Sequence, residues 1–162
     1  MVTREIKRHV KLGFSHLDTA EIVAHLNKLL ANYQIHRQKV MAYKWNIKGR
    51  DIIIMKDKFD QLDKSNSENI NKIAERIRVF GSVPLSTYTE YLDISEISEM
   101  KMGISGYEMV TEIIDDYEIL VSLMMNVNDS ANKIGDSGTF NMINEILYDL
   151  EREFWMLNEW TK

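Results

Sequence analysis

Apolar residues recur at three- and four-residue steps through four long stretches of this 162-residue chain, a periodicity typical of amphipathic helices. The stretches contain neither glycine nor proline, and they cover residues 14–48, 50–80, 107–134 and 139–162. Each would form a helix of roughly 35–50 Å at 1.5 Å per residue. Helices of this length in one small domain indicate a helical bundle.

Residues suited to helix capping stand at the expected ends of these stretches. Asp18 precedes the first apolar stripe with Glu21 three residues later, the spacing of a capping box. Ser105 and Glu108 have the same spacing before the third stretch, and Asp136 or Ser137 can cap the fourth. Gly81 follows the second stretch, where a left-handed terminator is expected.

The connection from residue 81 to residue 105 is too long for a tight turn. It carries its own short helical signal, because Thr87 and Glu90 form a capping-box pair around apolar residues. A long middle connection between two helical hairpins is the one-crossover topology of ferritin-like bundles. The sequence therefore predicts an all-α, ferritin-like four-helix bundle over residues 14–162, with a short helix in its middle connection and a basic helical arm at residues 1–13.

Composition narrows the function classes. Hydrophobic residues make up 44% and charged residues 28%, as in a globular protein. The chain has no cysteine, which excludes disulfides, thiolate metal sites and a cysteine nucleophile and fits a cytoplasmic location. Its first residues lack the apolar core of a secretory signal, and the longest purely apolar runs, such as Ile52–Met55, are too short to span a membrane.

Charge is distributed unevenly along the chain. Residues 1–64 contain 13 basic and 7 acidic side chains, net +6, whereas residues 65–162 contain 7 and 18, net −11. The overall charge of −5 argues against indiscriminate binding of nucleic acid, but the basic first part leaves room for a local anionic partner.

Few residue patterns indicate catalysis. The chain contains no Glu-x-x-His motif of the kind that di-iron bundles use, no phosphate-binding loop and no nucleophile elbow. Glu21 and His25 are four residues apart and could share a cation, although the same spacing also occurs on an ordinary solvated helix face.

Three motifs, in matching order and spacing over roughly residues 18–158, resemble the Dps family, the dodecameric mini-ferritins that protect bacterial DNA during starvation and oxidative stress. The first is Lys-Trp-Asn-Ile-Lys-Gly at 44–49, similar to the family's His-Trp-Asn-Val-Lys-Gly. The second is Ile-Ala-Glu-Arg-Ile-Arg at 73–78, followed by Gly81 and Pro84. The third is Gly-Asp-Ser-Gly-Thr at 135–139, with Glu151 and Trp-Met-Leu at 155–157 further on.

The resemblance implies a ferroxidase site shared by two subunits across a twofold axis. In this chain its five ligand positions carry Lys44, Lys56, Asp60, Asn71 and Glu75. Only Asp60 and Glu75 keep a ligating side chain of the family type. A protonated lysine has three donors and no lone pair, so it cannot bind iron. We therefore expect the ferroxidase centre to be absent and lysine–carboxylate pairs to take its place.

Two other interpretations of these positions remain open. A lysine with a lowered pKa would offer a neutral amine to a metal. Alternatively, the chain is an active iron-oxidising mini-ferritin with a relocated site that involves His25 or His36. For the protein as a whole, a purely structural or partner-binding bundle is a third hypothesis, beside the Dps-like cage and the active mini-ferritin.

The resemblance also implies a hollow shell of twelve subunits, with acid-lined pores near the start of the last helix. Asp129 and Asp136 are the nearest pore candidates, and helix capping is the alternative role of Asp136. Iron could still enter and mineralise on inner-face acids such as Asp57 and Asp60 without fast enzymatic oxidation.

A basic amino-terminal extension often binds DNA in this family. Four cations spaced to share one helix face stand before Gly13: Arg4, Lys7, Arg8 and Lys11. They could pair with phosphates in a sequence-independent, salt-sensitive way, which would place the protein on the nucleoid. Packing of the arm on a neighbouring subunit and lying on a membrane surface are the alternatives.

Overall fold

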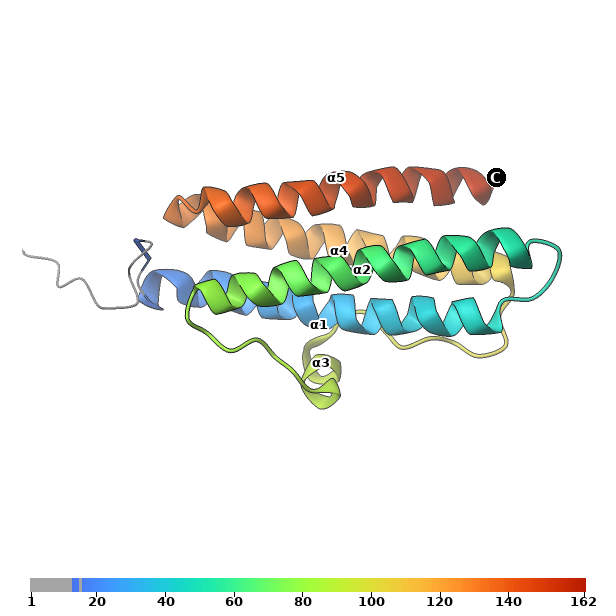
Figure 1. Cartoon of the computed structure of the whole chain (residues 1–162), viewed down its shortest axis with the longest axis horizontal. Helices are drawn as coiled ribbons and strands as arrows, with labels where there is room; N and C mark the ends of the chain where they lie inside the picture. Colours follow the sequence, from blue (N-terminus) through green and yellow to red (C-terminus); the bar gives the residue numbers. More distant parts are fainter. Residues whose placement is uncertain (1–12, 15) are drawn as a thin grey trace, which may run out of the picture.

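The computed structural model describes residues 13–14 and 16–162, and the ordered secondary structure in these ranges is helical (Figure 1). Four long helices form a bundle: α1 (His16–Asn46), α2 (Ile52–Val79), α4 (Gly106–Ile134) and α5 (Ser137–Trp160). The short helix α3 (Tyr88–Ile94) lies outside it. No described helix is long and apolar enough to cross a lipid bilayer.

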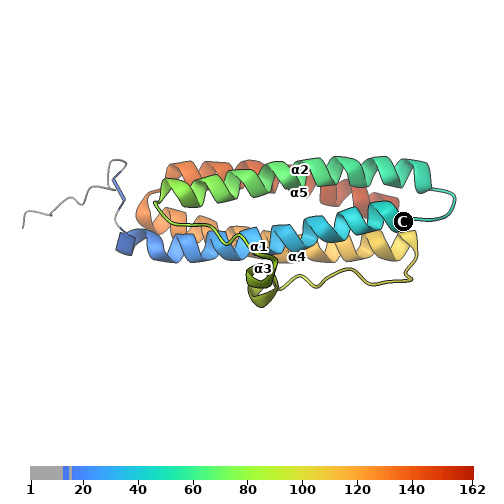
Figure 2. The ribbon, with the colours of Figure 1, turned by 60° about the horizontal axis from the view of Figure 1, so that its bottom comes forward.

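The order of the elements confirms the predicted ferritin-like fold. Helices α1 and α2 form one antiparallel hairpin and α4 and α5 form the other (Figure 1). The connection between them runs the length of the bundle and carries α3, which packs on α1 (Figure 2). Helix α1 therefore contacts α2, α3 and α4, and α5 packs mainly on α4.

The predicted apolar stripes form the core. Leu26, Tyr33 and Val40 of α1 are buried, as are Phe59 and Ile73 of α2. The stripes of α4 and α5 are buried against them, including Ile113, Leu120, Ile143 and Ile146. Burial of these side chains supplies the main driving force for folding.

Most predicted caps are present. Thr87 and Glu90 cap α3 reciprocally, and Ser105 and Glu108 do the same for α4. Asp136 caps α5 by accepting a hydrogen bond from the amide of Thr139, 3.0 Å away. The first helix differs from the prediction, because it begins at His16 and Asp18 lies inside its first turn instead of capping it.

One asparagine fastens the crossover to the bundle. The Asn32 side-chain oxygen, buried on α1, accepts hydrogen bonds from the amides of Glu96 and Ile97, each at 2.9 Å, and from the Ser95 hydroxyl at 3.2 Å. Its amide nitrogen donates to the backbone oxygen of Lys28. This clamp holds the segment after α3 against α1.

Candidate functional site

A cluster of two lysines and one aspartate bridges α1 and α2. Lys44, in the last turn of α1, donates a hydrogen bond to Oδ1 of Asp60 on α2. Lys64, one turn further along α2, lies 2.8 Å from Oδ2 of the same carboxylate. Both oxygens of Asp60 therefore face an ammonium group, and we call Lys44, Asp60 and Lys64 the ammonium cluster.

The two ammonium groups strengthen the acidity of Asp60. Hydrogen bonds from Lys44 and then Lys64 lower the pKa of Asp60 from 3.8 to about 2. Reciprocally, the hydrogen bond to Asp60 raises the pKa of Lys64. Both groups are thus charged at neutral pH, as in an ordinary lysine–carboxylate pair.

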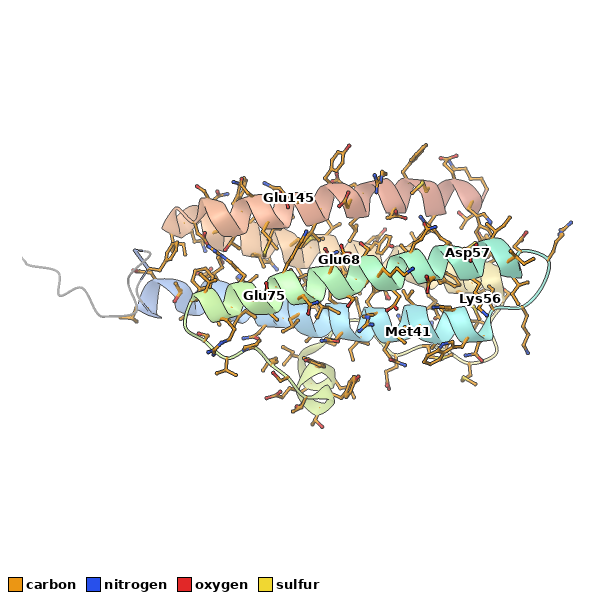
Figure 3. The ribbon with its side chains drawn as sticks, viewed as in Figure 1. Met41, Lys56, Asp57, Glu68, Glu75 and Glu145 are labelled. Carbon is orange, nitrogen blue, oxygen red and sulfur yellow. The ribbon has the colours of Figure 1, made fainter. Side chains whose placement is uncertain are left out.

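The other predicted site residues are not part of this cluster. Lys56 is exposed near the start of α2 and makes no ion pair among the residues that the structure describes (Figure 3). Asn71 and Glu75 are exposed one turn apart toward the other end of the same helix. Asp60 and Glu75 are 15 residues apart, about 22 Å along a helix, so one subunit cannot bring them to a shared ion.

Two histidines, His25 and His36, have protein partners. Nδ1 of His25 lies 2.8 Å from the Ser130 hydroxyl, which also contacts Glu21 at 3.2 Å. Lys133 donates to Glu21 at 2.8 Å and lowers the pKa of that carboxyl. Glu21 and His25 thus meet through Ser130, and the Lys133 ammonium occupies the place a shared cation would take beside Glu21.

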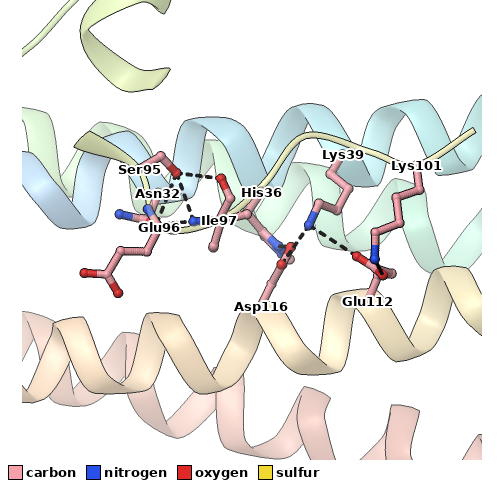
Figure 4. Close-up of polar contacts among 9 residues, drawn as sticks. All are labelled: Asn32, His36, Lys39, Ser95, Glu96, Ile97, Lys101, Glu112 and Asp116. Carbon is pink, nitrogen blue, oxygen red and sulfur yellow. Dashed lines mark hydrogen bonds and ion pairs between the residues drawn. The ribbon is translucent and has the colours of Figure 1, made fainter. Parts of the chain in front are cut away.

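His36 belongs to a buried polar network between α1 and α4 (Figure 4). Its Nδ1 lies 2.8 Å from Oδ2 of Asp116, and Nζ of Lys39 donates to Oδ1 of Asp116 at 2.8 Å. The side chains of His36, Lys39 and Asp116 are 0%, 1% and 5% exposed. Glu112, 3.9 Å from Lys39, links this trio to Lys101 on the crossover, 2.5 Å away.

Sequence reasoning missed this network, although a signal for it was present. His36 lies three residues after Tyr33 and four before Val40, so it falls on the apolar stripe of α1. A polar side chain at such a position must find a buried partner. Asp116 stands at an equivalent position on α4, three residues after buried Ile113 and four before Leu120.

Comparisons with known proteins agree with this architecture. The model of the Ferritin-like domain family matches residues 23–162. DNA protection during starvation protein 2 of Bacillus anthracis is 31% identical over 137 residues, which cover 85% of this chain and 94% of that protein. The crystal structure of a Dps protein from Vibrio cholerae O1 matches with a TM-score of 0.92 and 27% identity, over 98% of this chain and all of that one. This chain belongs to the Dps family.

A second Dps relative supports the same assignment. The DNA protection during starvation protein of Brevibacillus brevis is 31% identical over 132 residues, which cover 82% of this chain and 89% of that protein. The Vibrio cholerae protein is described as a member of the ferritin-like diiron-carboxylate superfamily. Proteins of this kind hold two iron ions between carboxylates and histidines of their helices.

Within one subunit, the side chains around Asp60 do not fit such a site. Ammonium groups from Lys44 and Lys64 already occupy the lone pairs of Asp60 that a metal would need. Across the described part of the chain, no three histidine, aspartate or glutamate side chains gather where they could hold a metal ion. The buried His36–Asp116 pair has a lysine as its third member, not another ligand.

The two pore candidates of the Dps resemblance differ in their surroundings. Asp129 is exposed near the end of α4. Asp136 is buried, and its carboxylate accepts hydrogen bonds from Thr139 and, at 2.6 Å, from Arg76. Both of its oxygens are therefore engaged within one subunit. The basic arm residues of the Dps resemblance lie outside the described residues: Arg4, Lys7, Arg8 and Lys11.

Proposed function

We propose that this chain is the subunit of a cytoplasmic, nucleoid-associated Dps cage that binds and protects DNA during starvation or oxidative stress. The cage would contain twelve copies and take up iron as cargo, without the ferroxidase centre that the Dps resemblance implies. Membership of the Dps family and the naming of two relatives for DNA protection during starvation support the DNA-related part of this proposal.

The ammonium cluster is the observation that supports the loss of ferroxidase activity. A ferrous ion beside Asp60 would have to displace two hydrogen-bonded ammonium groups. It would then remain next to their positive charges, which repel a dication. Lys56 stands at another ligand position of the family site and would add a third ammonium there, and no lysine offers a lone pair while it is protonated.

The proposal is tested by measuring Fe²⁺ oxidation by oxygen and by peroxide. The unmodified protein is expected to oxidise Fe²⁺ at the protein-free rate. The triple variant Lys44→His, Lys56→His, Asn71→Asp returns the family's ligand types to three positions and is expected to oxidise Fe²⁺ several-fold faster. The double variant Asn126→Asp, Lys162→His introduces similar side chains at exposed positions on α4 and beyond the end of α5, and it should behave like the unmodified protein.

Rapid oxidation by the unmodified protein would contradict the proposed loss of activity. It would favour the alternative function, an iron-oxidising and iron-storing mini-ferritin with a site elsewhere. Light scattering on the same samples tests the cage, because a monomer or dimer in solution would contradict twelvefold assembly.

The DNA-binding part of the proposal depends on the basic arm. Arg4, Lys7, Arg8 and Lys11 supply the cations, and the attraction to phosphates would be independent of base sequence. One arm offers only four cations, so several arms of one cage must engage a duplex together. Divalent cations that bridge acidic surface groups to phosphates would strengthen DNA binding. A chelator would then weaken that binding.

A further inference from the structure

A pocket of about 350 Å³ opens at the end of the bundle where three segments meet. The turn between α1 and α2, the start of α4 and the end of α5 come together there (Figure 1). The volume falls within the range of about 300–1,000 Å³ that small-molecule sites occupy. Its apolar floor includes Ile47 and Met55, both buried.

Two cations line this pocket without a partner of their own. Lys48 and Arg50, both exposed, take part in no ion pair or side-chain hydrogen bond within residues 13–14 and 16–162. The neighbouring carboxylate of Asp51 is also exposed and makes no capping hydrogen bond to α2. The lining thus carries a net charge of +1, with an arginine fork suited to a phosphate group.

Two aromatic rings line the same pocket. Tyr107 is 56% exposed and Trp160 is 37% exposed, so part of each ring remains free to contact a ligand. Aromatic rings beside cations are the combination that binds nucleotides, because the rings stack on the base and the cations pair with the phosphate. Asp51 adds an acceptor for an amino or hydroxyl group of the same ligand.

The start of α4 is not what makes this site. Ser105 and Glu108 cap this helix reciprocally, and the pocket is lined by the side chains of the two cations and the two rings. Gly106 contributes by shape, because a Cβ there would lie 2.7 Å from the Cδ1 atom of Ile47. A larger residue there would require the Ile47 side chain to shift.

We propose that this pocket binds nucleoside phosphates, with the phosphate at Lys48 and Arg50 and the base against Tyr107 and Trp160. A free nucleotide and a nucleotide within a single strand share this chemistry. The inference goes beyond the proposed DNA protection, because it concerns the body of the subunit and not its basic arm.

The test measures binding of AMP, adenosine and inorganic phosphate to the full-length protein by calorimetry. We expect AMP to bind more tightly than either fragment. The variant Lys48→Gln, Arg50→Gln should weaken AMP binding by about tenfold or more. The matched variant Lys72→Gln, Arg152→Gln removes the same charge from exposed positions outside the pocket and should leave AMP affinity unchanged.

A second pair of variants separates the role of the ring from that of charge. Tyr107→Leu should weaken AMP binding by about fivefold or more and leave phosphate binding unchanged, whereas Tyr107→Phe should retain the affinity. Light scattering on each variant confirms that assembly is unaltered. Competition with an eight-residue thymidine oligonucleotide identifies the source: displacement of AMP supports strand binding, and failure to displace it supports free nucleotides.

Three results would overturn the proposal. These are no AMP binding at millimolar concentration, equal affinity for AMP and inorganic phosphate, and an unchanged affinity in the Lys48→Gln, Arg50→Gln variant. None of these three results depends on iron oxidation or on the basic arm. The proposed function could therefore hold even if the pocket does not bind nucleoside phosphates.

Discussion

Asp60 receives ammonium groups from two directions, one across the helix pair and one from the next turn of its own helix. Lys44 is one-quarter exposed and Asp60 about one-third, so water screens their attraction only in part. Lys64 is 72% exposed and contributes less than Lys44. The result is a fixed, locally neutralised carboxylate, not a vacant ligand.

The pKa of Asp60 predicts how the cluster responds to acid. Because the folded-state pKa of about 2 lies below the ordinary value of 3.8, the stabilisation is complete above pH 4 and is lost as pH falls toward 2. Lys44→Met should therefore lower the thermal unfolding midpoint most above pH 4, with a difference that shrinks in acid and in high salt. A difference that grows in acid would contradict this assignment.

The buried trio of His36, Lys39 and Asp116 predicts a larger effect. Asp116→Leu leaves the Lys39 ammonium buried without its carboxylate, which should lower the free energy of unfolding by about 3 kcal/mol or more. The double variant Lys39→Met, Asp116→Leu removes both charges and should recover much of that loss. Denaturant unfolding of the two variants measures both values, and equal losses in both would show that the ion pair is not the cause.

At the level of elements, the Asn32 clamp is the contact that positions the crossover on α1. Asn32→Ala removes the acceptor of three hydrogen bonds and should cost about 2 kcal/mol. Hydrogen exchange at the amides of Glu96 and Ile97 should accelerate. Asn27→Ala is the matched control, because within the described residues Asn27 accepts one such bond, from the amide of Leu85. Equal effects on residues 95–97 in both variants would contradict the clamp.

Helix lengths and order followed from the sequence because few glycines interrupt long apolar stripes. Ends were predicted well where a side chain caps its own helix, as Thr87 does, since that contact is local.

Contacts across helices could not be predicted in the same way. A lysine paired with Asp60 was expected from the family resemblance, and Lys44 is that lysine. The second lysine, Lys64, lies one turn after Asp60 on α2 and is not one of the family's ligand positions. The His36–Asp116 pair joins residues 80 positions apart, and only the packing of α1 on α4 reveals it.

At the level of the whole molecule, charge opposes the proposed partner. Twelve copies at −5 each would carry −60, and such a cage would repel DNA at distances up to a Debye length of about 8 Å. Attraction must therefore come from basic segments that extend beyond this distance. The arm cations are the candidates in the sequence.

Neutralising the arm tests this balance. The variant Arg4→Gln, Lys7→Gln, Arg8→Gln, Lys11→Gln should abolish the shift of linear DNA in a gel. In the unmodified protein, affinity should fall steeply with salt, with a log–log slope of about −3.6 for each fully engaged arm. A control in which Lys72, Lys133, Arg152 and Lys162 become glutamine should still bind. Unchanged DNA binding by the arm variant, with and without a chelator, would show that the arm does not supply the attraction to DNA.

The ammonium cluster also makes the charge balance of Asp60 independent of the supply of metal ions. Lys44 and Lys64 are part of the polypeptide, so the countercharge of Asp60 arrives with folding and cannot be stripped by a chelator or exchanged for a competing ion. A subunit made in a metal-starved cell and one made in a metal-rich cell would therefore carry the same charge at this seam between α1 and α2. The surroundings of Asp60 would therefore need no metal-dependent maturation step after folding.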